Sequence, residues 1–269
     1  MGDFLACFRQ ELVFGKIPTQ LNDDLLYRIG RSVAQTMTTS MVVIGRDSRP
    51  TSESLSHSAG RGVMDAGSHT INIGVVSPEE LAFACQTLGA DAAVLIGSDQ
   101  PIRDCNGLRI IMPDGMPMTD PQRWHAIEYL AAMQGFTSCS KPGGYRRTSV
   151  REQWLQDLLQ RFTPVRNLHL HCLGDQSVIL QQLTSIAPLI DLQITASSQA
   201  ELDHWQQTGV LPAIPATTDL LIMGDRYHQG YVPLDLNTPA PIVITDAPYT
   251  TLADLLAVLS QCGSIQQLA

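Results

Sequence analysis

Short apolar runs recur at regular intervals through the first half of the chain. Each run is four to six residues long and gives way to glycine or to a polar loop: residues 41–44, 71–76, 92–96 and 108–112. Two of them, residues 41–44 and 92–96, are apolar at every position, which is typical of strands that are buried on both faces of a sheet, whereas the other two each contain one polar residue, Asn72 or Arg109. The stretches between them repeat apolar residues at helical spacing, for example Leu25, Ile29 and Val33.

Capping residues mark where the intervening helices begin and end. The predicted starts are Asn22, Thr51 or Ser52, Ser77 and Asp120, and the predicted stops are Gly67, Gly89 and Gly135. Ser77-Pro78-Glu79-Glu80 forms a capping box with proline at the first helical position. Helices alternating with buried strands predict a three-layer α/β fold with a mixed, mainly parallel sheet.

The second half of the chain repeats this organisation after a break. Residues 138–148 lack periodicity and contain Pro-Gly-Gly, so we place a domain boundary there, between domains of residues 1–140 and 148–269. The second domain is expected to contain the following elements: a helix over 149–162 that carries Trp154, Leu155, Leu158 and Phe162, strands at 168–173, 192–195, 220–223 and 242–245, and a helix over about 250–261. Both domains are expected to be α/β/α layers.

Composition and charge narrow the classes of partner. The 269 residues carry 17 Lys and Arg against 26 Asp and Glu, a net charge of −9, which argues against nucleic-acid binding. No apolar run approaches the length of about 20 residues that spans a bilayer, and no signal peptide precedes the first helix. The six cysteines form no C-x-x-C pair. We therefore expect a cytoplasmic protein with reduced thiols and no membrane insertion.

Three loops carry candidate chemistry, because ligands bind at the carboxyl ends of strands in parallel α/β sheets. They are residues 45–52 with Arg46 and Arg49, residues 97–101 with Ser98, and residues 223–226 with Asp225 and Arg226. A serine beside arginines and an Asp-Arg pair are parts of a phosphoryl-transfer site. Two plainer interpretations stay open. The arginines could pair with Asp47, and Ser98 could be a turn residue.

The order and spacing of these loops resemble the α-D-phosphohexomutases, and among them the bacterial phosphomannomutases of polysaccharide synthesis. The resemblance is clearest over residues 21–31, 42–55, 65–67 and 88–110, and weaker over 154–155 and 219–226. The resemblance implies that this chain corresponds to the first two domains of that family. By resemblance, Ser98 falls on the phosphoserine, Asp225 and Arg226 on the end of a magnesium loop, and Arg109 on a lysine that transfers protons.

Several residues depart from the family pattern. Asp99 and Gln100 follow the serine in place of histidine and asparagine, and a carboxylate there disfavours phosphorylation. Residues 222–224 replace acidic metal ligands, which leaves Asp225 alone to hold magnesium. Arg109 cannot act as a base near neutral pH. Phe14 falls where the family has a phosphate-facing arginine, and the two later domains of the family have no counterpart before Ala269.

These departures predict a degenerate, non-catalytic phosphomannomutase homologue that binds a protein partner or itself, with no cofactor. Apolar residues such as Leu211, Ile214 and Val232 are expected on the surface that the missing domains would cover. Two alternatives remain: a phosphotransferase that uses Ser98 and magnesium, with Arg46, Arg49 and Arg226 as the phosphate clamp, or a non-catalytic hexose-phosphate sensor. His169 and His171 alternate along a predicted strand and could bind a metal, although no acidic residue or third histidine lies nearby in the sequence to complete the site.

Overall fold

The computed structural model divides into two compact units, residues 1–151 and 152–269, which are described separately. The structure describes residues 4–9, 11–97, 104–161, 168–174, 178–190, 192–208, 210, 213, 215, 220–224 and 229–231. Within this part of the chain, no helix is both long and apolar enough to cross a membrane.

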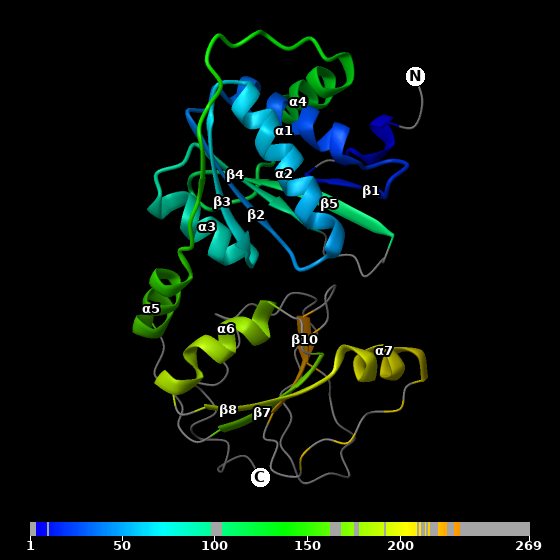
Figure 1. Ribbon diagram of the computed structural model, residues 1–269, viewed down its shortest axis with the longest axis vertical. Helices are drawn as coiled ribbons and strands as arrows, with labels where there is room; N and C mark the ends of the chain where they lie inside the picture. Colours follow the sequence, from blue (N-terminus) through cyan, green and yellow to red (C-terminus); the bar gives the residue numbers. More distant parts are fainter. Residues whose placement is uncertain are drawn as a thin grey trace. The chain divides into compact units, whose positions relative to one another are not determined.

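The first unit is built on a six-stranded mixed sheet (Figure 1). Its strands, in spatial order, are β1 (Val13–Lys16), β5 (Cys105–Ile111), β4 (Ala92–Ile96), β2 (Met41–Arg46), β3 (His69–Val75) and β6 (Tyr145–Arg147). The last four run parallel to one another, whereas β5 is antiparallel to β4 and to β1. The predicted strands are all present. Because only residues 97–104 separate β4 from β5 in the sequence, the connection is too short for the crossover of about a dozen residues that a parallel pair needs, and the pair is antiparallel.

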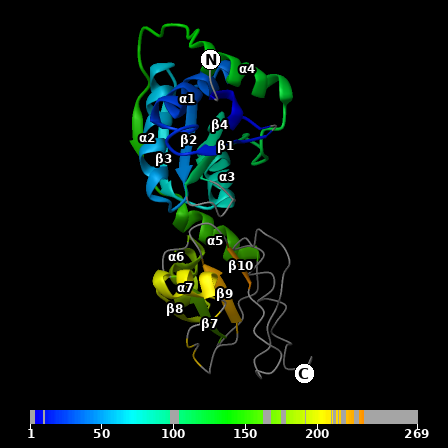
Figure 2. The same ribbon diagram turned by 90° about the vertical axis from the view of Figure 1, so that its right-hand side faces the viewer.

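Helices cover both faces of this sheet, as Figure 2 shows from the side. One apolar core lies under α1 (Asp23–Met37), α2 (Pro50–Asp65) and α4 (Pro121–Met133), and includes Ile29, Val63 and Ile127. A second core lies under α3 (Pro78–Thr87) and includes Leu81 and Val43. The short 3₁₀ helix η1 (Phe4–Cys7) precedes the sheet. The predicted three-layer α/β arrangement is confirmed.

The helix boundaries test the capping predictions directly. Asn22, Ser77 and Asp120 accept hydrogen bonds from the first turns of α1, α3 and α4, as predicted. The prediction for α2 was wrong, because the helix begins at Pro50 and Arg49 occupies the cap position without a side-chain cap. Proline has a backbone torsion suited to the first helical position, so the helix starts earlier than the hydroxyl residues indicated.

Two of the three predicted glycine stops are confirmed. Gly67 and Gly89 adopt left-handed φ angles after α2 and α3, as expected of C-terminal glycines. After α4 it is Gln134, with φ of 54°, that adopts this conformation, one residue before the predicted Gly135.

Two short strands, β1 and β6, carried no recognisable sequence signal. Each has only three or four residues, too few for an alternating pattern. β6 lies inside the aperiodic segment 138–148 and adds to the edge of the first sheet beside β3.

The second unit contains a four-stranded sheet in the order β10-β9-β7-β8. Its elements are α5 (Arg151–Arg161), β7 (Leu168–Leu173), α6 (Val178–Ile186), the 3₁₀ helix η2 (Ala187–Leu189), β8 (Leu192–Ser197), α7 (Gln199–Thr208), β9 (Leu220–Gly224) and β10 (Gln229–Tyr231). β8, β7 and β9 are parallel, and β10 is antiparallel to β9. The predicted strand at 242–245, the helix at 250–261 and Phe162 lie outside the described residues.

Candidate functional site

The carboxyl ends of β2 and β4 bring two of the predicted loops together. Arg46 at the end of β2 pairs with Ile96 at the end of β4, and the Asp47 amide donates to the Ile96 carbonyl at 2.9 Å. The chain then continues from β4 to Gly97, the residue directly before Ser98. Ser98 itself, with residues 99–103, lies outside the described residues. The structure therefore describes the chain up to Gly97, the residue directly before the predicted phosphoserine.

Asp47 organises the loop that follows β2. One of its carboxylate oxygens, Oδ1, accepts from the Arg49 amide at 3.1 Å and from the Ser52 hydroxyl. The other, Oδ2, lies 3.6 Å from Arg49 Nε. A Cβ at Gly97 would lie 2.7 Å from Asp47 Oδ2, so this close approach requires glycine. The carboxylate thus lies against the backbone that leads into Ser98.

Asn106 in β5 holds the same loop from the other side. It is fully buried, and its Nδ2 donates to Thr51 Oγ1 and to Ser52 Oγ, both at 2.9 Å. Its Oδ1 accepts from the Gly107 amide at 2.7 Å. The Gly107 carbonyl in turn accepts from Gly97 at 3.0 Å. Sequence reasoning missed this residue, although a buried amide beside an apolar strand is a signal that could have indicated it.

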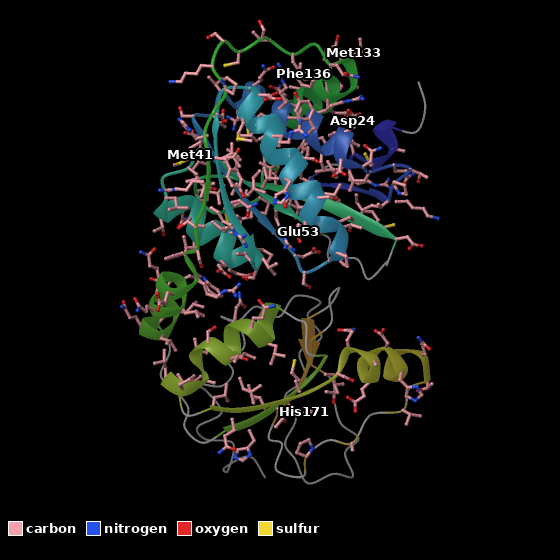
Figure 3. The ribbon with its side chains drawn as sticks, in the orientation of Figure 1. Asp24, Met41, Glu53, Met133, Phe136 and His171 are labelled. Atoms are coloured by element: carbon pink, nitrogen blue, oxygen red, sulfur yellow. The ribbon has the colours of Figure 1, made fainter. Side chains whose placement is uncertain are left out.

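The two arginines of the loop have separate partners. Arg46 Nη2 lies 3.3 Å from Glu53 Oε2, and its Nη1 donates to the Asp47 carbonyl at 3.3 Å. Figure 3 labels Glu53 near the start of α2. The Arg49 side chain is only 1% exposed and lies beside Asp47. The plainer interpretation, pairing with Asp47, is therefore observed for Arg49, whereas a phosphate-binding role for either residue stays a prediction.

Phe14 occupies the neighbouring strand β1. It pairs with Gly107 of β5, and a Cβ at Gly107 would lie 3.7 Å from Phe14 Cδ2. Gly107 is in turn hydrogen bonded to Gly97, the residue before Ser98. Phe14 is therefore connected to Gly97 through one intervening residue, Gly107. An apolar ring, and not a cation, therefore lies at this place in the fold.

Arg109 lies further along β5, opposite Leu95 of β4. It is half-buried, and its neighbours Leu108 and Ile110 belong to the core on the opposite face of the sheet. Arg109 therefore extends from the α3 face.

The predicted metal loop follows β9 in the second unit. Residues 222–224, which replace the acidic residues of the family pattern, belong to β9, and Ile222 pairs with Cys172 of β7. Asp225 and Arg226 lie outside the described residues, as do Leu211, Ile214 and Val232. Among the described residues, no group of three or more His, Cys, Asp or Glu side chains is placed to hold a metal ion.

His171 is a core residue of the second unit. It is 4% exposed, and its Nδ1 and Nε2 lie 2.7 and 2.9 Å from the hydroxyls of Thr195 and Ser197 on β8. Burial lowers the pKa of this imidazole, which favours the neutral ring. Figure 3 labels His171 over the sheet. Both ring nitrogens have hydroxyl partners, so the geometry favours the structural role over a metal site.

Comparisons with known proteins agree with this architecture. Residues 7–136 match the family described as phosphoglucomutase/phosphomannomutase, alpha/beta/alpha domain I. A phosphomannomutase of Klebsiella pneumoniae is 31% identical over 153 residues, 56% of this chain and 98% of that protein. A phosphomannomutase of Vibrio cholerae is 30% identical over 167 residues, 60% of this chain and 36% of that protein. The chain thus spans about a third of the length of the Vibrio relative.

A solved structure shares the fold at lower identity. A putative phosphomannomutase from Thermus thermophilus aligns with a TM-score of 0.63 and 19% identity, covering 84% of this chain and 56% of that one. The likeness extends beyond the first unit, since it covers more of the chain than the family match over residues 7–136. From the near-complete match to the Klebsiella relative and the α/β/α arrangement of its first unit, the chain belongs to the phosphoglucomutase/phosphomannomutase family.

Proposed function

We propose that this chain is a non-catalytic member of its family that acts by binding a protein partner or a second copy of itself. The observation that carries the proposal is the contrast at the end of the first sheet. The loop after β2, which packs against Gly97, is held by hydrogen bonds among Asp47, Ser52 and Asn106, whereas Phe14 lies where a phosphate-facing arginine is expected by resemblance. An apolar ring supplies no charge to neutralise a phosphate.

Magnesium is the metal that members of this family normally use, and the residues available here fit it poorly. Magnesium prefers octahedral oxygen ligands. The side chains of Ile222 and Met223 offer no oxygen, and Gly224 has no side chain, which leaves Asp225 as the one acidic residue of that loop. Asp99 adds a negative charge beside Ser98 that a bound metal would have to offset. These features support a protein that works without a cofactor.

The alternative function is phosphoryl transfer through Ser98. It is favoured by the contacts of the loop after β2, because Arg46 donates to the Asp47 carbonyl and Arg49 lies beside the Asp47 carboxylate, which packs against Gly97. A loop held in this way could position a serine for attack on a hexose phosphate. A hexose-phosphate sensor would use the same loop without turnover.

A single experiment separates these functions. The protein is incubated with mannose 1,6-bisphosphate and magnesium, the peptide containing Ser98 is analysed by mass spectrometry, and conversion of mannose 1-phosphate to mannose 6-phosphate is followed in parallel. Ser98→Ala is the matched control, and the Vibrio cholerae phosphomannomutase is the positive control. We expect neither phosphopeptide nor conversion. A phosphopeptide that disappears in Ser98→Ala would overturn the proposal in favour of phosphoryl transfer.

Binding is measured on the same preparation. Light scattering reports self-association. A thermal shift with mannose 6-phosphate reports a sensor, because saturation at 100 times the dissociation constant stabilises the folded state by about 2.7 kcal/mol. The protein-binding role would be contradicted if the protein were monomeric, retrieved no partner and showed a clear thermal shift with mannose 6-phosphate. That result would favour a hexose-phosphate sensor.

A further inference from the structure

The outer edge of the first sheet is formed by β6, and its surroundings are cationic. We call residues 141–147 the β6 strip. Lys141, Arg146 and Arg147 are all exposed, and Tyr145 between them is 50% exposed. No Asp or Glu occurs anywhere from residue 135 to 151, in a chain whose net charge is −9. The strip therefore concentrates positive charge on a protein that is acidic as a whole.

Among the residues that the structure describes, only β3 pairs with the main chain of β6. β6 ends the strand order, with Tyr145 opposite Thr70 and Arg147 opposite Asn72 of β3. The Thr70 amide donates to the Gly144 carbonyl at 2.9 Å, and the Thr148 amide donates to the Asn72 carbonyl at 3.1 Å. In a parallel ladder alternate residues bond to the same neighbour. The peptide groups of Tyr145 and Arg147 consequently face away from β3.

The charges of the strip are not neutralised locally. Lys141, Arg146 and Arg147 form no ion pair with any other described residue, whereas Arg123 on α4 lies 3.4 Å from Asp120. Neighbouring residues of a strand point to opposite faces, so Arg146 extends on one side of the sheet and Arg147 on the other, with Tyr145. A strand added at this edge would meet a cation on each of its faces.

The strip is held in place before any partner binds. The Gly143 amide donates to the Met64 carbonyl at 2.8 Å, and the Gly144 amide donates to His69 Nδ1 at 2.9 Å. A Cβ at Gly143 would lie 1.9 Å from the Ser68 carbonyl oxygen, so the backbone packs directly against the turn before β3. Figures 1 and 2 both show this segment beside β3. An ordered edge adds little ordering cost to binding.

We propose that the β6 strip binds an extended acidic segment of a partner protein, which adds as a strand to the free edge. Main-chain hydrogen bonds to Tyr145 and Arg147 would supply affinity, and carboxylates on alternate faces would pair with Arg146 and Arg147. A second copy is disfavoured as the occupant, because pairing of β6 with itself would place arginines close to arginines. A nucleic acid is disfavoured by the net charge outside the strip.

This inference rests on the proposed function, because it names the class of partner that the proposed protein-binding role would involve. The test uses the full chain and a fluorescein-labelled probe peptide, acetyl-Val-Glu-Glu-Thr-Glu-Glu-Val-amide, with fluorescence anisotropy. The control probe replaces each Glu by Gln. The peptide-binding assay does not measure turnover, so a negative result would not bear on the proposed lack of mutase activity. Conversely, phosphorylation of Ser98 would not bear on peptide binding by the β6 strip.

Four variants separate the contribution of charge from that of strand addition. R146E/R147E reverses the cations, and Arg123→Glu is the control for an exposed arginine elsewhere. Tyr145→Pro removes an outward-facing amide without removing a bond to β3, and Tyr145→Ala controls for loss of the ring. Circular dichroism verifies that each variant folds.

We expect the acidic probe to bind at least tenfold more tightly than its Gln counterpart and to lose at least tenfold in affinity with R146E/R147E and with Tyr145→Pro. Arg123→Glu and Tyr145→Ala should change affinity less than threefold. Equal binding of both probes, or binding that survives charge reversal, would overturn the proposal. Sensitivity to charge reversal but not to Tyr145→Pro would overturn strand addition and leave a simple electrostatic contact.

Discussion

Helices α1 and α2 approach each other closely at two glycines, and Gly62→Ala tests how tightly this contact holds the first unit. A Cβ at Gly62 would lie 1.9 Å from the Tyr27 carbonyl oxygen on α1. Reciprocally, a Cβ at Gly30 would lie 2.1 Å from the Ala59 carbonyl oxygen on α2. Both obstacles are backbone atoms, which cannot rotate away. The helices would therefore have to move apart.

The size of the effect follows from that distance. Real Cβ contacts are not shorter than 3.0 Å, so the helices must separate by about 1 Å at this point. Overpacking a close-packed core costs about 1–3 kcal/mol, and backbone displacement places Gly62→Ala at the upper end. Alanine has a higher helix propensity than glycine, which offsets about 1 kcal/mol of this loss. We expect a net loss of about 2 kcal/mol in the free energy of unfolding.

Gly60→Ala is the matched control in the same helix. Its Cβ would lie 3.2 Å from Thr70 Cγ2, a side-chain methyl that can adjust slightly. The propensity gain then remains, and we expect a change between zero and about 1 kcal/mol of stabilisation. The opposite signs of the two substitutions make the comparison informative.

Urea denaturation followed by circular dichroism gives both free energies, and hydrogen exchange of peptides from residues 23–65 assigns the change to α1 and α2. If Gly62→Ala were as stable as Gly60→Ala, the close helix contact described here would be refuted.

Three further predictions concern single side chains. Asp47→Ala should lower the free energy of unfolding by about 3 kcal/mol in urea denaturation, because buried Arg49 loses its carboxylate partner; an unchanged midpoint would contradict this. Burial lowers the pKa of His171 below its usual value of 6.5, so the unfolded chain takes up the proton first as the pH falls below that value. The protection of β7 amides against hydrogen exchange, corrected for the slower intrinsic exchange in acid, should then fall as the pH drops below 6.5, and His171→Gln should weaken this dependence. Burial also raises the pKa of Cys85 to about 11, so iodoacetamide at about pH 8 should label exposed Cys139 first, as mass spectrometry would show.

The main elements of the fold could be predicted because their signals are local. Short apolar runs such as residues 92–96 are typical of buried strands, and Asn22 or Ser77 caps a helix within three residues of itself. β6 escaped prediction because three exposed residues at a sheet edge carry no alternation, and only pairing with β3 makes them a strand.

The candidate site was predictable only in part, for a related reason. The convergence of the loops after β2 and β4 follows from parallel topology, which the sequence indicated. Asn106, by contrast, meets Thr51 and Ser52 across more than fifty residues of chain. Contacts at that separation depend on sheet order, and sheet order was not available from periodicity. The placement of Ser98, Asp225 and Arg226 stays a prediction.

The polar cluster at the end of the first sheet is needed for folding whether or not the protein is catalytic. Asp47, Ser52 and Asn106 satisfy one another's hydrogen bonds in a buried setting, and losing any one of them would leave a buried polar group without its partner. Folding alone is therefore sufficient reason for these residues to be present. Under the proposed function, activity would depend instead on groups that the fold does not need, such as the cation that the family resemblance implies at the position of Phe14. Replacing such groups leaves the packing intact, so evidence for or against catalysis must come from them and not from the cluster.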